Sequence, residues 1–130
     1  MGNGGVAGLV YGAFLLGAPL MAAMAAWTPG SEIVGQSVQV ETNGIVNTVY
    51  FDPGGGARII TPGGAAVQAA WTASNQQLCL QTGTGKECWP YQNAFQAGQQ
   101  VTLMSSCQVA SRWTPLSTNP TMQQRAGERG

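Results

Sequence analysis

The stretch that decides the fold is VGQSVQVETNGIVNTVYFD, residues 34–52. At its centre, Asn43-Gly44 is the strongest short signal for a two-residue β-hairpin, because a type I′ turn needs positive φ at both central positions. A turn at that point fixes the register, with the opposed pairs Gln36–Phe51, Val38–Val49 and Val40–Asn47. One face of the hairpin then holds Val38, Val40, Val49 and Phe51, and the other holds Gln39, Glu41, Thr48 and Tyr50. Turn chemistry and hydrophobic pattern therefore predict the same antiparallel hairpin.

Short alternating runs separated by Gly, Pro and Asn continue beyond this hairpin, at the spacing of an antiparallel meander. The further strands that we expect are residues 57–61, 65–73, 77–82, 86–91 and a longer one at 99–109. Together with the hairpin they make about seven strands. The predicted fold class is all-β, a small antiparallel up-and-down meander or barrel, because closure removes exposed strand edges.

The amino-terminal segment has a different amino-acid composition. Residues 6–26 read VAGLVYGAFLLGAPLMAAMAA and contain no charged side chain. One interpretation is a cleaved secretory signal peptide that ends at the A-x-A site Ala23-Met24-Ala25. The other is an uncleaved transmembrane anchor, in which Gly4, Gly8 and Gly12 provide G-x-x-x-G spacings for close helix packing. Both interpretations predict export, to the periplasm or the outside of the cell.

Domain boundaries follow from these changes in texture. We expect residues 1–26 to be a signal peptide or transmembrane anchor, and residues 31–113 to be the β-barrel-like domain. Residues 114–130 contain two prolines and no apolar pattern, so we expect a flexible carboxyl-terminal tail.

Composition narrows the classes of function. Only 8% of the 130 residues are charged, the net charge is zero, and there is no histidine. Without histidine there is no Ser-His-Asp or Cys-His catalysis and no His-bearing zinc site. Sparse and balanced charge argues against nucleic acid as a partner, because neutralising phosphates requires a basic face. We therefore expect no enzymatic activity, no metal and no cofactor.

The chain contains three cysteines, Cys79, Cys88 and Cys107. Cys79 and Cys88 are symmetric about the Gly83-Thr84 turn and would face each other across a hairpin, which predicts a disulfide in an exported protein. A Cys88–Cys107 bridge is the rival pairing. If Cys79 pairs with Cys88, Cys107 is either a buried free thiol or the site of an intermolecular bridge. Its sequence parity with Val101, Leu103 and Val109 favours burial.

Aromatic side chains are the candidate binding residues. Five of them would either line an apolar pocket at the barrel mouth or fill a small core: Tyr50, Phe51, Trp71, Trp89 and Tyr91. The carboxylates form no catalytic or metal-binding motif: Glu32, Glu41, Asp52, Glu87 and Glu128.

Several of these motifs occur together in one recognisable order. They are TVYFDPGG at residues 48–55, Trp71, Leu78-Cys79-Leu80 and Cys88-Trp89-Pro90-Tyr91. Over residues 33–110 the chain resembles small secreted proteins of alphaproteobacteria with a lipocalin-like meander. It departs from their G-x-W motif, where it has Ala69-Ala70-Trp71. A weaker similarity is to the periplasmic inhibitors of c-type lysozyme. Because the shared residues form turns, core and disulfide, the resemblance implies fold and not activity.

Two functional hypotheses follow. The first is a non-enzymatic, exported binding or interaction module whose partner is a small apolar ligand or another protein. The second is an accessory subunit of an inner-membrane or envelope complex, anchored through residues 6–26.

Overall fold

The computed structural model describes residues 27–120 and contains only β-strands and connecting loops in that range. All strand pairings are antiparallel, as predicted. The strands are β1 Ser37–Thr42, β2 Ile45–Phe51, β3 Gly56–Ile60, β4 Ala66–Ser74, β5 Gln77–Thr82, β6 Gly85–Pro90, β7 Val101–Met104 and β8 Ala110–Pro115.

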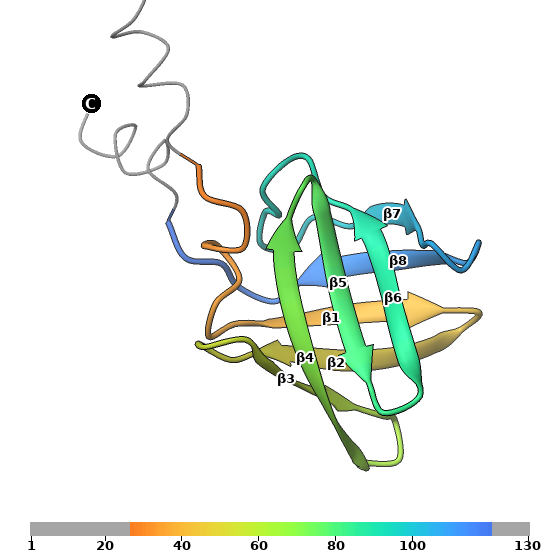
Figure 1. Ribbon diagram of the computed structural model, residues 1–130. Helices are drawn as coiled ribbons and strands as arrows, with labels where there is room; N and C mark the ends of the chain where they lie inside the picture. Colours follow the sequence, from red (N-terminus) through yellow and green to blue (C-terminus); the bar gives the residue numbers. More distant parts are fainter. Residues whose placement is uncertain (1–26, 121–130) are drawn as a thin grey trace, which may run out of the picture.

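The eight strands form one nearly closed barrel. Their order in the sheet is β6-β5-β4-β3-β2-β1-β8-β7, so β1 pairs with both β2 and β8, and the remaining seam lies between β6 and β7. In Figure 1 the strands β4, β5 and β6 cross in front of β1, β2 and β8. Strands that are neighbours in the chain are neighbours in the sheet everywhere except at this seam. The up-and-down topology was correctly predicted.

The β1–β2 hairpin has the predicted register. Val38 lies opposite Val49 and Val40 opposite Asn47, while the backbone N–H of Phe51 donates to the carbonyl of Gln36. Asn43 and Gly44 have φ of 53° and 83°, the signature of the I′ turn. Its predicted inward face is buried at all four positions: Val38, Val40, Val49 and Phe51.

The carboxyl-terminal part of the barrel differs from the prediction. The prediction of a single long strand at 99–109 is wrong. The chain turns between Ser105 and Val109, so that β7 ends before the turn and an eighth strand, β8, follows it. The Ser105 hydroxyl accepts hydrogen bonds from the backbone N–H groups of Cys107 and Val109, and Gln108 takes a positive φ of 66°. Strand β8 then extends to Pro115, so the boundary that we expected after residue 113 falls inside a strand.

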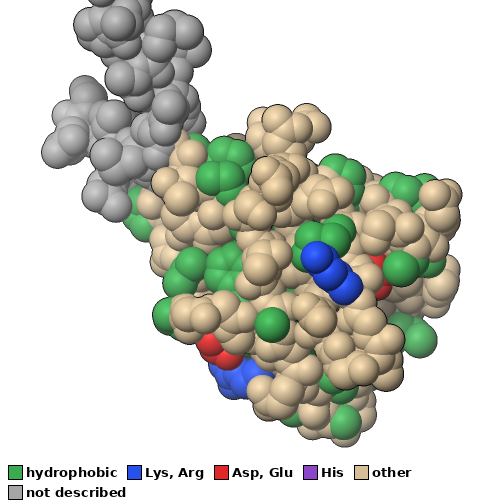
Figure 2. Space-filling view, in the orientation of Figure 1, with side chains coloured by type: hydrophobic (Ala, Val, Ile, Leu, Met, Phe, Trp, Pro, Cys, Tyr) green, Lys and Arg blue, Asp and Glu red, His purple; other side chains and the backbone are tan. Residues whose placement is uncertain are grey.

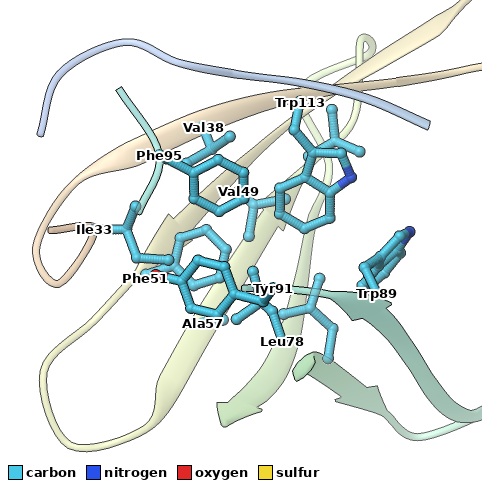
Figure 3. Packing of buried hydrophobic residues seen from close by; sticks show 12 residues of the cluster. Ile33, Val38, Val49, Phe51, Ala57, Leu78, Trp89, Tyr91, Phe95 and Trp113 are labelled. Carbon is cyan, nitrogen blue, oxygen red and sulfur yellow. The ribbon is translucent and has the colours of Figure 1, made fainter. Parts of the chain in front are cut away.

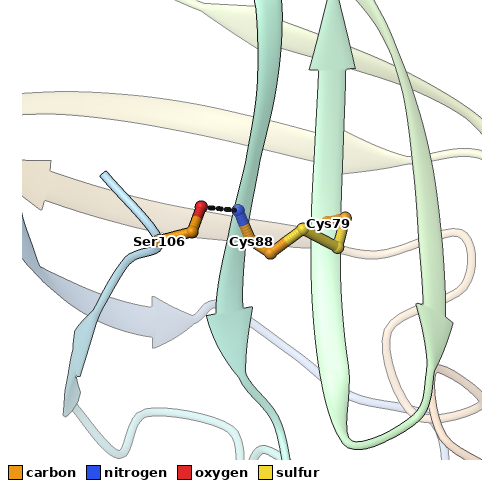
Figure 4. Close-up of a disulfide and its surroundings, with 3 residues drawn as sticks. All are labelled: Cys79, Cys88 and Ser106. Atoms are coloured by element: carbon orange, nitrogen blue, oxygen red, sulfur yellow. Dashed lines mark hydrogen bonds between the residues drawn. A yellow bond between two sulfur atoms is a disulfide. The ribbon is translucent and has the colours of Figure 1, made fainter. Parts of the chain in front are cut away.

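The predicted disulfide is present. Cys79 on β5 and Cys88 on β6 lie directly opposite each other and are bonded. The backbone of Cys88 faces the seam, where its N–H donates to the Ser106 hydroxyl and its carbonyl accepts from the Ser106 N–H (Figure 4). The rival Cys88–Cys107 pairing is therefore excluded. Cys107 is exposed, not buried as expected, because the turn carries it out of the strand.

Alternate connections give the barrel two different ends. The turns β1–β2, β3–β4, β5–β6 and β7–β8 meet at one end, which we call the open end (Figure 1). The other end, the closed end, is covered by residues 27–35 and by the loop 91–100. Ile33, Phe51 and Phe95 pack there, and Trp113 extends the core toward the open end (Figure 3).

Some predictions fall outside the described residues. The expected hydrophobic helix at 6–26, with Gly4, Gly8 and Gly12, belongs to them, and so does Glu128. Within residues 27–120, no helix is long and apolar enough to cross a membrane. Beyond β8, residues 116–119 return to the closed end, where the Asn119 side chain donates to the carbonyls of Ser31 and Val34.

Candidate functional site

The open end of the barrel contains a cavity of about 340 Å³, which we call the mouth cavity. It opens to solvent between the hairpin turns and extends toward the core. Its apolar walls come from five strand residues that point inward: Val40, Val49, Ile59, Leu80 and Trp89. Polar side chains lie around the same cavity: Thr42, Asn47, Thr82, Thr84 and Glu87. This combination of an apolar interior with a few polar groups is typical of a small-molecule site.

Trp89 lies in the wall of the mouth cavity and has an unsatisfied polar atom. The residue is 5% exposed, and its indole Nε1 has no hydrogen-bond partner among residues 27–120. The neighbouring Trp113, whose ring centroid lies 4.9 Å away in an edge-to-face arrangement, has the same unpaired indole nitrogen. Figure 3 shows both nitrogens on the ring sides that face away from Ile33 and Phe51. Burial of an unpaired N–H costs about 1–3 kcal/mol, so these two groups need an explanation.

Glu87 is the acidic group of the mouth cavity. It lies opposite Leu80 in the β5–β6 pair and shares its strand face with Trp89, so its side chain belongs to the inner surface of the barrel. Within residues 27–120, no cation lies within salt-bridge distance of its carboxylate, because the two ion pairs found there join Asp52 to Arg58 and Glu41 to Arg112. Glu87 is therefore a half-buried carboxylate without a counter-ion in the described part of the chain.

Two further reactive or charged groups lie at the rim of the cavity. Lys86 precedes Glu87 on β6 and is exposed, since alternation along the strand assigns it to the outer face. Cys107, from the β7–β8 turn, lines the same cavity with its free thiol exposed.

The closed end is organised around a different carboxylate, Glu32, which is fully buried. Its Oε1 accepts a hydrogen bond from Trp27 Nε1 at 3.0 Å. Its Oε2 accepts from the Tyr91 hydroxyl and from the Phe95 backbone N–H, the latter at 2.9 Å. These three donors join the amino-terminal segment to the β6–β7 loop, and they satisfy a charge that would otherwise be costly to bury.

Tyr91 completes this network. Its hydroxyl donates to Glu32 and accepts from the Gly30 backbone N–H at 2.9 Å. Burial of the phenol raises the pKa of Tyr91 far above its ordinary value, and the hydrogen bond to Glu32 and the charge of that carboxylate raise it further. Ionised Tyr91 is therefore incompatible with the closed end as it is built.

The five predicted aromatic residues do not form one pocket. Trp89 lines the mouth cavity, whereas Phe51 and Tyr91 are buried in the core. Trp71 is half-buried against Phe51, with its Nε1 donating to the carbonyl of Asp52 at 3.0 Å. Tyr50 lies on the outer surface beneath the Arg58 guanidinium, 4.8 Å from its ring centroid. The five predicted aromatic residues are thus divided between the core, the wall of the mouth cavity and the outer surface.

Sequence reasoning missed the residues that connect the two ends. Successive aromatic contacts run from Trp27 through Tyr91, Phe95 and Trp113 to Trp89, with ring centroids 4.9–5.7 Å apart. Phe95 lies in a loop and Trp113 in β8, a strand that was not predicted, so neither had a local pattern to mark it. Glu32 had no marking signal either, because its partners are distant in the chain.

Comparisons with known proteins do not assign this site to a family. No protein-family model, curated protein or solved structure matches the chain. The described residues also bring together no group of three or more His, Cys, Asp or Glu side chains that could hold a metal ion. The site must therefore be interpreted from its own residues.

Proposed function

We propose that this protein is a non-enzymatic binding module that takes a small, mainly apolar molecule into the mouth cavity. The observation that carries the proposal is the mouth cavity itself, which opens to solvent and is walled by inward-pointing aliphatic side chains and Trp89, with hydroxyl and amide groups around it. Such a lining suits a small apolar molecule that carries a few polar atoms.

The size and lining of the cavity support a small ligand. A volume of about 340 Å³ lies at the lower end of the range for small-molecule sites, about 300–1,000 Å³. Val40, Val49, Ile59 and Leu80 offer a hydrocarbon body four aliphatic surfaces on several strands. The barrel holds these surfaces in place, so little ordering is required on binding.

The ionisable groups of the cavity support binding rather than catalysis. Among the described residues that line it, the ionisable side chains are Lys86, Glu87 and Cys107. A carboxylate pair of the kind that hydrolyses glycosidic bonds is not among them. The remaining polar groups, hydroxyls and one amide, are suited to orienting a ligand.

We propose further that the protein acts outside the cytoplasm. The Cys79–Cys88 disulfide supports an oxidising compartment, since such bonds are rare in reducing ones. Intact mass of the native protein tests the route: a chain that begins near Ala26 supports cleavage of a signal peptide, and a chain that retains residues 1–26 in the membrane fraction supports the anchored alternative.

Binding is tested with phenylpropanol, a neutral probe with an apolar body and one hydroxyl. Titration followed by two-dimensional proton–nitrogen NMR is expected to shift the Trp89 indole signal, with a dissociation constant of about millimolar for so small a molecule. Asn47→Phe should fill the mouth and abolish the shift. The matched control is Thr48→Phe, one residue away on the outer face, which should leave it intact. An unchanged Trp89 signal would refute the proposal.

A further inference from the structure

The mouth cavity also indicates the charge of its ligand, an inference that rests on the proposed function. Glu87 lies on the inner face of β6, opposite the buried Leu80 and two residues from the buried Trp89. Carboxylates on the inside of a small barrel are costly unless they are paired. Glu87 is half-buried on this inner face, and among residues 27–120 no cation is paired with it.

The described part of the chain provides no counter-ion for Glu87. Its three cationic side chains are Arg58, Lys86 and Arg112. Arg58 lies 3.0 Å from the Asp52 carboxylate, and Arg112 lies 3.6 Å from that of Glu41. Lys86 is adjacent in sequence, but strand alternation points it to the other face, and it forms no ion pair with Glu87. Within residues 27–120 the positive partner is thus missing.

The other polar groups around the cavity suit an ammonium group. The Thr82 and Thr84 hydroxyls lie 3.0 Å apart at the rim, and the amide oxygen of Asn47 is a further acceptor. An ammonium group donates up to three hydrogen bonds and accepts none, so carboxylate, hydroxyl and amide oxygens can all receive them. The aliphatic walls beyond the rim take the rest of the molecule.

We infer that the ligand is a small organic amine with an apolar body, whose ammonium group pairs with Glu87 while the hydrocarbon part occupies the mouth cavity. Lys86, at the rim of the cavity, would favour a ligand of the opposite charge. If its exposed charge dominated the entrance, the preferred ligand would be a carboxylate. Burial favours Glu87, because an ion pair inside the barrel is screened less than one at the exposed rim.

The test compares three probes with one hydrocarbon body and different head groups: phenylpropylamine, phenylpropanol and phenylpropanoate. Affinities are measured for the full chain by calorimetry and by the shift of the Trp89 indole signal. The amine is expected to bind about tenfold more tightly than the alcohol, as a charge-assisted hydrogen bond does over a neutral one. The carboxylate is expected to bind most weakly.

Two variants then test whether Glu87 is the source of the preference for the amine. Glu87→Gln keeps size and polarity but removes the charge, and it should bring the amine to within about twofold of the alcohol. Glu41→Gln is the matched control, since Glu41 lies on the outer face with Arg112 and should leave the preference unchanged. Thermal unfolding of each variant verifies that the barrel is intact.

The outcomes separate the two proposals. Equal affinity of the three probes, or tighter binding of phenylpropanoate, overturns the amine inference while the binding function stands. Retention of the amine preference in Glu87→Gln overturns it as well, since Glu87 would not then be the counter-ion. If no probe shifts the Trp89 signal at about 10 mM, the proposed binding function itself fails.

Discussion

The two ends of the barrel are made by the same strands but treat their polar groups in opposite ways. At the closed end Glu32 is completely buried and receives hydrogen bonds from Trp27, Tyr91 and Phe95. At the open end, among residues 27–120, Glu87 has no counter-ion and the buried indole N–H of Trp89 has no acceptor. A satisfied network stabilises a unique structure, whereas a partly exposed carboxylate in an open cavity is accessible to a ligand. Under the proposed function, stability is concentrated at one end and recognition at the other.

The sparsely charged exterior agrees with this division. Figure 2 shows one face of the molecule, on which side chains without charge predominate and basic or acidic groups are few. Charge is therefore a weak guide to partners over most of the molecule. Under the proposed function, the carboxylate of Glu87 inside the mouth can then contribute strongly to the choice of ligand, because charged side chains are sparse.

The largest effect is expected from removing the carboxylate of the closed end. Glu32→Ala leaves the donors of Trp27, Tyr91 and Phe95 buried without an acceptor, so we expect a loss of about 3–5 kcal/mol in the free energy of unfolding. Glu87→Ala at the open end breaks no such contact and should change stability by about 0.5 kcal/mol or less. Urea unfolding of both variants measures the difference. Equal losses would mean that the two ends are not specialised.

The disulfide belongs to neither end and should affect stability alone. Replacing both Cys79 and Cys88 by Ala removes a cross-link between residues that are nine positions apart. Loss of this cross-link should lower the free energy of unfolding by about 2–3 kcal/mol. The affinity of the mouth cavity for phenylpropanol should stay the same, because the disulfide faces away from it. Cys107→Ser is the control for thiol chemistry in the stability measurement, where it should be neutral. A loss of affinity in the double variant would show that the open end depends on this cross-link.

A matched pair of glycines compares the backbone at the two ends. Gly30 has φ of +91°, and an added Cβ would lie 2.9 Å from Cζ3 of Trp71, whose ring is held by its hydrogen bond to Asp52. Gly30→Ala should therefore destabilise the protein by about 2 kcal/mol. Gly63, in the β3–β4 turn at the open end, has nothing within 4 Å of an added Cβ, and Gly63→Ala should be neutral within about 0.5 kcal/mol. Thermal unfolding would contradict the comparison if the two substitutions behaved alike.

The same contrast explains which features could be predicted from sequence. The β1–β2 hairpin and the Cys79–Cys88 bridge depend on turns and parity within about 20 residues, and both were predicted correctly. The Ser105–Val109 turn was missed because it contains neither Gly nor Pro; the Ser105 hydroxyl and the positive φ of Gln108 make it. Local pattern alone could not reveal a turn of that kind.

The functional ends were harder to predict for a different reason. Glu32 and Tyr91 are 59 residues apart, and no spacing rule joins them. Trp89 was one of the five predicted aromatic residues, but Glu87, two positions before it, stood among five carboxylates without a motif. Its significance depends on the register of β5 with β6 and on the absence of a nearby cation within residues 27–120, both of which require the folded barrel.

The smallest of the expected effects is a pH dependence confined to the closed end. Folding raises the pKa of Tyr91, chiefly through burial and then through Glu32, so the native state holds the phenolic proton more tightly than the unfolded chain. The contribution of this group to stability is fully present below the unfolded pKa of about 10 and is lost as the pH rises above it, at up to about 1.4 kcal/mol per pH unit.

Tyr91→Phe isolates this contribution. The variant lacks the hydroxyl that donates to Glu32 and accepts from Gly30, so it should be less stable than the natural chain at neutral pH. Above about pH 10 its stability should decline less steeply, because it has no proton to lose at this position. Urea unfolding at several alkaline pH values gives both slopes, and equal slopes would mean that Tyr91 is not the source of the pH dependence.

Because the mouth cavity lies at the opposite end of the barrel, probe affinity in Tyr91→Phe at neutral pH should match that of the natural chain. A weakened affinity would instead mean that the aromatic contacts from Tyr91 through Phe95 and Trp113 to Trp89 couple the two ends.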